Sequence, residues 1–274
     1  MVNNPAFFCK RVFLELKSFV IPLPASTVIK KINGVSFEFD FSLSSQVKKM
    51  YAGSYQPIIT ETLKKYLKNG DTFIDMGANI GYFSMVAASL VGKTGQVHSF
   101  EPVPKYFLKL NNFAENNKQY NIVANQFALG DKEQLGKIYI EGESNIGSNT
   151  FIPALLGNKG NNIIAEVPIR RFDRYVEERG LKNIKLIKID VEGFEFPVLK
   201  GMEGYFLECS KNGSCPAIIC EIAPAVYETA GHGPKDIFNY MKNFSYYPFE
   251  IINQRKKIIA GKKQLDDVIF KFCN

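Results

Sequence analysis

The sequence lacks the features of a metalloprotein or of a disulfide-stabilised domain. Its 274 residues include two histidines and five cysteines, and no two cysteines form a C-x-x-C pair. Because neither His98 nor His232 stands near the cysteines at a metal-ligand spacing, no metal site is expected. An odd number of irregularly spaced cysteines is typical of free thiols in a reducing compartment.

A long uninterrupted hydrophobic run is also missing. Charged side chains divide the apolar N-terminal segment, residues 5–21, at Lys10, Arg11, Glu15 and Lys17. The segment therefore has neither the roughly 18-residue span of a membrane helix nor a clean signal-peptide core, and a cytoplasmic protein is expected. As a helix it would carry one apolar face, formed by Phe8, Val12, Leu16 and Phe19. This face either packs on the domain or makes peripheral membrane contact, and the sequence leaves both open.

Long runs of basic charge are absent as well. The formal net charge of +7 favours an acidic partner such as a phosphorylated sugar, a nucleotide or an anionic membrane surface. The densest basic cluster, however, is only Gln254-Arg255-Lys256-Lys257. Without an RNA-binding module or an Asn-Pro-Pro-Tyr type motif for handling a base, a nucleic-acid partner is not expected.

What the sequence does contain is a regular alternation of short apolar strands and helical stretches. Strands are predicted at 35–39, 72–76, 96–100, 121–127, 184–189 and 217–222, and helices at 57–67, 80–91, 104–116, 195–207 and 234–244. A final pair of strands is predicted near 249–253 and 267–272, and the sequence allows this pair to be antiparallel. Residues 137–169 are predicted as hairpin and loop. This rhythm predicts an α/β fold with a doubly wound parallel sheet, whose ligands lie at the carboxyl ends of the strands.

The turn from Asp75 to Gly81, with the sequence DMGANIG, leaves the second predicted strand and opens a helix. A dinucleotide-binding turn that starts at Gly77 would have glycines where this chain has Asn79 and Tyr82, so that fingerprint fails at two of three positions. Asp75 would repel a phosphate but can accept hydrogen bonds from the ammonium group of S-adenosylmethionine. Gly77 and Gly81 let the backbone approach a ligand, and the helix N-terminus favours its carboxylate. A structural turn capped by Asn79 is the alternative.

Glu101 ends the next predicted strand, in the run Ser99-Phe100-Glu101-Pro102. A carboxylate at this place accepts hydrogen bonds from both hydroxyls of a ribose. A surface glutamate in contact only with solvent is the other interpretation, and the turn at 75–81 in register with Glu101 argues against it.

Five segments follow one another in an order that is typical of one family: FIDMGANIGYFS, HSFEPVPKYFLKLNNFAENN, FALGD, IKLIKIDVEGFEFPVLKG and IICEIAPAVYE. Together they resemble the FkbM-type family of S-adenosylmethionine-dependent methyltransferases, over roughly residues 50–250. The run IDVEGFE distinguishes this family from other methyltransferases. One departure is Tyr55-Gln56, where members usually have Tyr-Glu, so a substrate or cofactor contact there is in doubt.

The resemblance implies a Rossmann-like, seven-stranded methyltransferase sheet over residues 51–274, with residues 1–50 as a small N-terminal helix and β-ribbon appendage. It implies that the cofactor-binding residues are Asp75, Gly77, Asn79, Gly81, Glu101, Pro102, Ala128 and Leu129. It also places Asp190 and Glu192 beside the methyl donor, where they are the candidate catalytic residues. Structural roles for both acids, His232 as the base, and an undefined role for Glu221 stay open.

The family implies transfer of a methyl group to a hydroxyl of a sugar unit in a glycan, glycolipid or secondary metabolite. The expected partner is therefore a small-molecule or glycan acceptor. A nucleic-acid methyltransferase and a noncatalytic S-adenosylmethionine-binding scaffold are the alternatives. The sequence leaves the acceptor, the atom methylated and the oligomeric state open.

Overall fold

The structure is a computed structural model that describes residues 26–140, 149–152, 163–213, 215–251, 258 and 267–273. The expected N-terminal helix and the basic cluster at 254–257 lie outside the described residues. Within the described ranges, no helix is long and apolar enough to cross a membrane.

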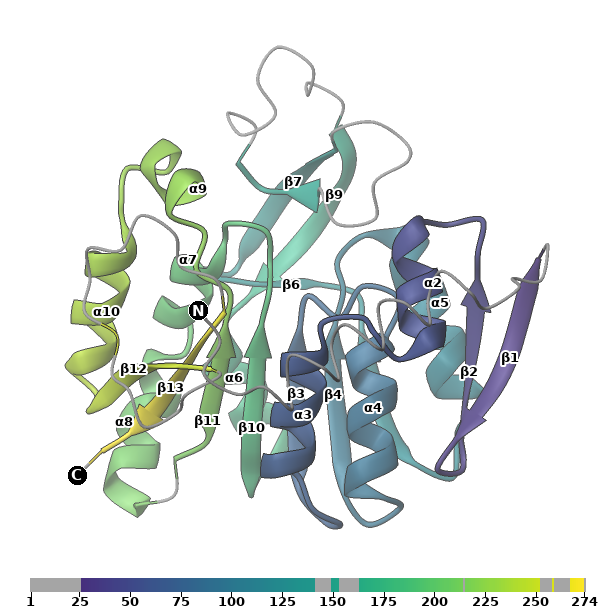
Figure 1. Ribbon diagram of the computed structural model, residues 1–274. Helices are drawn as coiled ribbons and strands as arrows, with labels where there is room; N and C mark the ends of the chain where they lie inside the picture. Colours follow the sequence, from purple (N-terminus) through teal and green to yellow (C-terminus); the bar gives the residue numbers. More distant parts are fainter. Residues whose placement is uncertain are drawn as a thin grey trace.

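A seven-stranded sheet forms the centre of the molecule (Figure 1). Its strands, in spatial order, are β12 (Tyr246–Glu250), β13 (Val268–Phe272), β11 (Ala217–Cys220), β10 (Ile184–Ile189), β3 (Thr72–Met76), β4 (Gln96–Phe100) and β5 (Asn121–Asn125). The strands from β11 to β5 are parallel, whereas β13 is antiparallel to both β11 and β12. The expected α/β fold and the antiparallel final pair are both confirmed.

Helices cover both faces of this sheet because alternate side chains of each strand point to opposite faces. On β3, Phe73 belongs to one buried cluster and Ile74 to the other. The first face is covered by α3 (Pro57–Tyr66), α4 (Tyr82–Val91) and α5 (Pro104–Glu115). The second is covered by α6 (Phe172–Arg179), α7 (Glu195–Lys200), α8 (Glu203–Asn212), α9 (Pro224–Thr229) and α10 (Pro234–Lys242). The sheet is therefore doubly wound, as the sequence predicts.

The N-terminal ribbon is a hairpin of β1 (Thr27–Ile32) and β2 (Val35–Asp40), followed by α2 (Ser45–Ala52). Val35, Phe37 and Phe39 alternate with more exposed residues and are buried. Phe37 packs edge-on against Phe113 of α5, with ring centroids 5.5 Å apart. The ribbon thus shares the core of the main sheet, and the boundary at residue 50 stays a prediction.

A second, four-stranded sheet contains β6 (Ala128–Leu129), β9 (Ile163–Arg170), β7 (Gln134–Ile140) and β8 (Asn149–Thr150), in that spatial order. The predicted hairpin is present as the antiparallel pair β7 and β9, but the sequence did not reveal that it joins a sheet. In Figure 1 this sheet stands beyond the carboxyl ends of β3 and β10. It therefore covers the edge where ligands bind in a doubly wound fold.

The single helix predicted at 195–207 is two helices, α7 and α8, which are separated at Gly201 and Met202. A Cβ atom at Gly201 would overlap the backbone carbonyl oxygen of Gly130. The break is therefore a place of close approach to the segment after β6, which helical periodicity does not report. Helices α2, α6 and α9 were also not predicted.

Candidate functional site

A cavity of about 310 Å³ opens at the carboxyl ends of β3, β4, β10 and β11. The chain passes from β3 to β4 and β5 on one side, and β10 and β11 lie on the other, so the strand order reverses between β3 and β10. Such a switch point leaves a crevice that ligands occupy. Residues of α2, of the segment before α3 and of the second sheet also line the cavity, for example Met50, Gln56 and Ile138.

The turn after β3 brings the backbone of this strand against the end of β10. Gly77 has a φ of 78°, which strongly favours glycine, and a Cβ atom there would overlap the backbone carbonyl oxygen of Asp190. The backbone N–H groups of Gly77 and Ala78 both donate to the carbonyl oxygen of Phe100, at 3.0 and 3.0 Å. The turn is therefore fixed between two neighbouring strands, and its residues line the cavity.

Asn79 and Glu101 connect this turn to the end of β4. Asn79 has a φ of 52°, and its backbone N–H donates to Oε2 of Glu101 at 2.8 Å. The N–H of Val103 donates to Oε1 of the same carboxyl at 2.9 Å, which leaves other lone pairs of both oxygens for a ligand. Burial raises the pKa of Glu101 to about 7, against the lowering effect of these two N–H donors. Glu101 is thus a fixed acceptor that lines the cavity.

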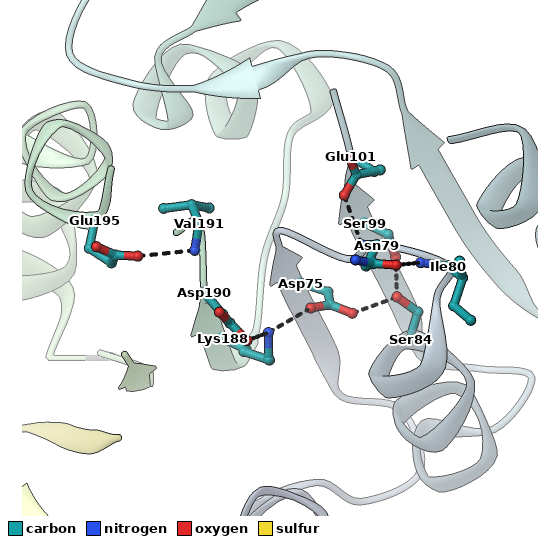
Figure 2. A network of polar contacts seen from close by, with 10 residues as sticks. All are labelled: Asp75, Asn79, Ile80, Ser84, Ser99, Glu101, Lys188, Asp190, Val191 and Glu195. Atoms are coloured by element: carbon teal, nitrogen blue, oxygen red, sulfur yellow. Dashed lines mark hydrogen bonds and ion pairs between the residues drawn. The ribbon is translucent and has the colours of Figure 1, made fainter. Parts of the chain in front are cut away.

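Asp75 and Gly81 lie apart from the other predicted cofactor residues. In the described part of the chain neither lines the cavity, and Asp75 is 1% exposed. The hydroxyl of Ser84 donates to Oδ2 of Asp75 at 2.6 Å and lies 2.7 Å from the hydroxyl of Ser99 (Figure 2). Gly81 begins α4 with a φ of 89° and faces α5. Direct contact of Asp75 with a cofactor stays a prediction.

A buried lysine accompanies Asp190 on the other side of the switch point. Lys188, on β10, is 3% exposed, and its Nζ lies 2.9 Å from Oδ2 of Asp190 and 3.9 Å from Oδ1 of Asp75. Burial lowers the pKa of Lys188, but the charges of Asp190 and Asp75 outweigh it and raise the pKa above its ordinary value. Lys188 is therefore an ammonium ion, and it lines the cavity together with Asp190.

Glu195 holds the turn that carries Asp190 and Glu192 through hydrogen bonds to its backbone. Oε1 of Glu195 accepts hydrogen bonds from the backbone N–H groups of Val191 and Gly193, both at 3.1 Å. The hydroxyl of Tyr227 donates to Oε2 at 3.0 Å. In the run IDVEGFE the first two acids therefore line the cavity and the third, fully buried, shapes the turn.

Two further carboxyl groups lie beside Asp190. Glu192 has a φ of 53°, and Glu221 follows β11. Burial and then the charge of Asp190 raise the pKa of Glu192 to about 8 and that of Glu221 to about 9. At neutral pH both groups are protonated and are able to donate a hydrogen bond. The structure thus brings Glu221, whose role the sequence left open, to the two predicted catalytic residues.

The site also contains Tyr55 and Gln56, where the sequence left a substrate or cofactor contact in doubt, and aromatic residues that were not predicted. Tyr55 lies near enough to Asp190, Glu192 and Glu221 for their charges to raise its pKa, although burial is the larger cause. The Oε1 atom of Gln56 is buried in the described structure without a hydrogen-bond partner, and Gln56 lines the cavity. The aromatic lining further includes Tyr82, Phe83, Phe127, Phe151 and Phe194.

His232, the alternative base, belongs elsewhere. In the described structure it is not one of the residues that line the cavity, and its ring stacks on Tyr227 with centroids 5.0 Å apart. The sequence does contain a pattern that indicates functional roles for Lys188 and Glu195, although neither was predicted. Each is a charged residue inside a run that is otherwise typical of a buried strand or helix, and charges in such places are paired.

The residues present fit S-adenosylmethionine. Glu101 offers a carboxylate for the ribose, and Pro102, Ala128 and Leu129 offer an apolar surface for the adenine. The unpartnered Oε1 of Gln56 suits a donor such as an ammonium group, and the carboxyl group of Asp190 suits a sulfonium charge. All the predicted site residues except Asp75 and Gly81 line this one cavity.

The chain is similar to known methyltransferases. The family described as "Methyltransferase FkbM domain" matches residues 75–248. The chain is 31% identical over 163 residues to 31-O-demethyl-FK506 methyltransferase FkbM from Streptomyces tacrolimicus, which covers 50% of this chain and 61% of that protein. It is 30% identical over 146 residues to a protein-L-isoaspartate O-methyltransferase from Methanococcus aeolicus, covering 52% and 66%.

A third relative matches over almost its whole length. Hexuronic acid methyltransferase AglP from Haloferax volcanii is 23% identical over 258 residues, which covers 93% of this chain and 96% of that protein. The chain spans 61% and 66% of the length of the two relatives with the higher identity.

Proposed function

The chain belongs to the FkbM methyltransferase family, and we propose that it transfers a methyl group from S-adenosylmethionine to a hydroxyl oxygen of a sugar unit. The family confirms the resemblance drawn from the motifs, and the chain carries an S-adenosylmethionine-dependent methyltransferase domain. The sugar acceptor, in a glycan, glycolipid or secondary metabolite, is the further step of this proposal.

One observation carries the choice of acceptor. Next to the switch point, Tyr55 and the carboxyl groups of Asp190, Glu192 and Glu221 surround one part of the cavity. Sugars combine hydroxyl groups, which bind carboxyl groups and the tyrosine hydroxyl, with apolar C–H faces, which pack on aromatic rings. One relative is named for a sugar acceptor, hexuronic acid, and another is named for O-methylation of FK506.

The residues divide the work of the reaction between them. Bound S-adenosylmethionine supplies a methyl group that is already electrophilic, so the protein acts mainly by alignment, which contributes up to about 7 to 11 kcal/mol. Glu101 and the turn at 77–79 hold the donor. Asp190 takes the proton of the acceptor hydroxyl, a step worth roughly 10² to 10⁴ in rate. Glu192 and Glu221, protonated at neutral pH, donate hydrogen bonds that orient the acceptor.

The proposal is tested by incubating the protein with S-adenosylmethionine and defined acceptors, and by measuring methylated products by mass spectrometry. The acceptors are methyl β-glucopyranoside, methyl β-glucuronide, an isoaspartyl peptide and a short RNA. We expect methylation of at least one sugar, on oxygen. If only the peptide or only the RNA is methylated, the sugar acceptor is wrong and that molecule's class is the acceptor instead. Calorimetric titration with S-adenosylmethionine, before any acceptor is added, checks the cofactor site separately.

A cytoplasmic location is part of the same proposal. S-adenosylmethionine is available there, and irregularly spaced free cysteines suit a reducing compartment. Fluorescence of a tagged chain in the source cells, compared with a cytoplasmic marker, tests it.

A further inference from the structure

Lys188 occupies an unusual place for a lysine. It lies in the middle of the main sheet and is 3% exposed, while Lys185, three residues earlier on the same strand, is exposed. Lys188 pairs in register with Asp75 across β10 and β3, the two strands at which the strand order reverses. A charged side chain is kept at such a position only if it is paired, because burial of an isolated charge is strongly unfavourable.

The contacts of Lys188 point toward the cavity. Its Nζ lies 2.9 Å from Oδ2 of Asp190, at hydrogen-bond distance, and 5.3 Å from the centre of the ring of Phe83. Oδ1 of Asp75 lies 3.9 Å from Nζ and has no hydrogen-bond partner in the described structure. Figure 2 shows the ammonium group between the two carboxyl groups. Asp75 therefore balances Lys188 from the adjacent strand, and Lys188 in turn holds Asp190.

The surroundings of Asp190 make this contact decisive. The ionisable groups around Asp190 come from four parts of the chain. Tyr55 precedes α3, Asp75 lies on β3, and Glu221 follows β11. Lys188 on β10 and Glu192 in the turn after β10 stand on either side of Asp190 in the sequence. Of the described residues that line the cavity, Lys188 carries the only basic side chain. Without it, no positive charge among the described lining residues would offset the negative charge of Asp190, and the loss of a nearby opposite charge disfavours the charged form of a carboxyl group.

We propose, on the basis of the sugar O-methyltransferase function above, that Lys188 is a positioning residue for methyl transfer. Its ammonium group, balanced by Asp75, aims the carboxylate of Asp190 at the acceptor hydroxyl and keeps it ionised beside Glu192 and Glu221. Lys188 does not take the proton itself, because it is already protonated; it acts through Asp190. The base of the reaction is thus assembled from two neighbouring strands, and Asp75 serves it from beneath the cavity.

The first test needs no acceptor and no turnover. The protein is labelled with aspartate that carries ¹³C at the side-chain carboxyl, the resonance of Asp190 is assigned by its loss in Asp190→Asn, and its titration is followed by NMR. We expect Lys188→Met to move the titration midpoint of Asp190 upward by roughly 1 to 3 pH units. Lys188→Arg keeps the midpoint near that of the wild type, and Lys185→Met, the matched control, does not move it. An unchanged midpoint in Lys188→Met overturns the proposal.

Removal of one partner of a buried ion pair leaves the other charge uncompensated, so Lys188→Met destabilises the folded state and a second variant is needed. The double variant Lys188→Met/Asp75→Asn removes both charges and serves as the second test protein. Its Asp190 resonance is expected to titrate at higher pH than that of Asp75→Asn alone. Equal midpoints in these two variants overturn the proposal as well.

The second test uses the sugar that the wild type methylates. We expect Lys188→Met to lower kcat by roughly 10²-fold and to displace the acidic limb of the pH profile of kcat to higher pH. The KM for S-adenosylmethionine is expected to change by less than about threefold. Lys188→Arg recovers most of kcat. Equal losses in kcat and in donor affinity would mean that Lys188 only supports the fold. If the wild type methylates no sugar, the proposed function fails, but the NMR titration still decides the role of Lys188.

Discussion

The two halves of the cavity are built in different ways. The half formed by the ends of β3 and β4 presents a turn and a mostly uncharged lining, which are held by local contacts such as those of Gly77, Asn79 and Glu101. The half formed by the ends of β10 and β11 presents ionisable side chains, among them Lys188 and Asp190. We call the first the donor half and the second the acceptor half, after the roles proposed above.

This difference separates the properties that depend on short sequence motifs from those that depend on tertiary contacts. The donor half depends on two turns whose residues lie close together in the chain, so a few substitutions there change the affinity for the donor. The acceptor half depends on charges that come from β3, β10, the segment before α3 and the end of β11. Substitutions there are expected to change turnover and pH dependence instead.

The largest effect is expected from Asp190→Asn in the acceptor half. The amide cannot take a proton, so kcat falls by roughly 10² to 10⁴. Affinity for S-adenosylmethionine, measured by calorimetry, stays within about threefold of the wild type. If the donor affinity falls as much as kcat, Asp190 belongs to the donor half and the comparison breaks down.

Gly77→Ala tests the point where the halves touch. A Cβ atom at position 77 would overlap the carbonyl oxygen of Asp190, and the φ of 78° is unfavourable for alanine. We expect a loss of about 3 kcal/mol in the free energy of unfolding, measured in urea. Gly213→Ala is the matched control, because its φ is 65° and nothing lies within 4 Å of the added atom. Equal losses in the two variants would show that the contact with Asp190 is unimportant.

Glu101→Gln tests the donor half alone. A neutral amide is a weaker acceptor, and it cannot accept from both Asn79 and Val103 as the carboxyl group does. The loss of charge-assisted hydrogen bonds, worth about 1.5 to 3 kcal/mol, weakens donor binding by roughly 10- to 100-fold. At saturating donor, kcat is expected to change by less than about threefold. Glu115→Gln, at an exposed position of α5, serves as the control and binds the donor like the wild type.

The last prediction concerns the pH dependence of stability in the ligand-free protein. The folded-state pKa values of Glu192 and Glu221, about 8 and about 9, lie above the ordinary carboxyl value of 4.5. Between these values the folded state binds more protons than the unfolded state, so the free energy of unfolding falls as pH rises from about 4.5 to 9. Urea unfolding of Glu192→Gln/Glu221→Gln should show a shallower fall than the wild type. Identical pH dependence in both proteins would contradict the raised pKa values.

The sequence predicted the main sheet well because its strands are short, buried and separated by helices of clear periodicity. Thr72–Met76, Gln96–Phe100 and Ile184–Ile189 were predicted with their observed bounds. The second sheet was not predicted, since β6 and β8 have only two residues each and acquire their partners through tertiary contacts. The break at Gly201 was also missed, and the close approach of Gly201 to Gly130 is a tertiary contact between distant parts of the chain.

The candidate site shows the same division. Asp190 and Glu192 were found through the motif IDVEGFE, and Glu101 through its place at the end of a strand. Lys188 stands two residues before Asp190, yet its pairing with Asp75 depends on β10 lying beside β3, which chain order does not state.

By itself, the sequence determined the family, the doubly wound sheet and the turn at residues 75–81, because hydrophobic periodicity and glycine positions can be read from consecutive residues. Only the tertiary structure decided which charges face one another. It placed Asp75 beneath the cavity, balanced Lys188 between two carboxyl groups and gathered Glu221 beside Glu192. Burial and distance set the strength of such electrostatic interactions, and neither is defined until strands from distant parts of the chain lie side by side.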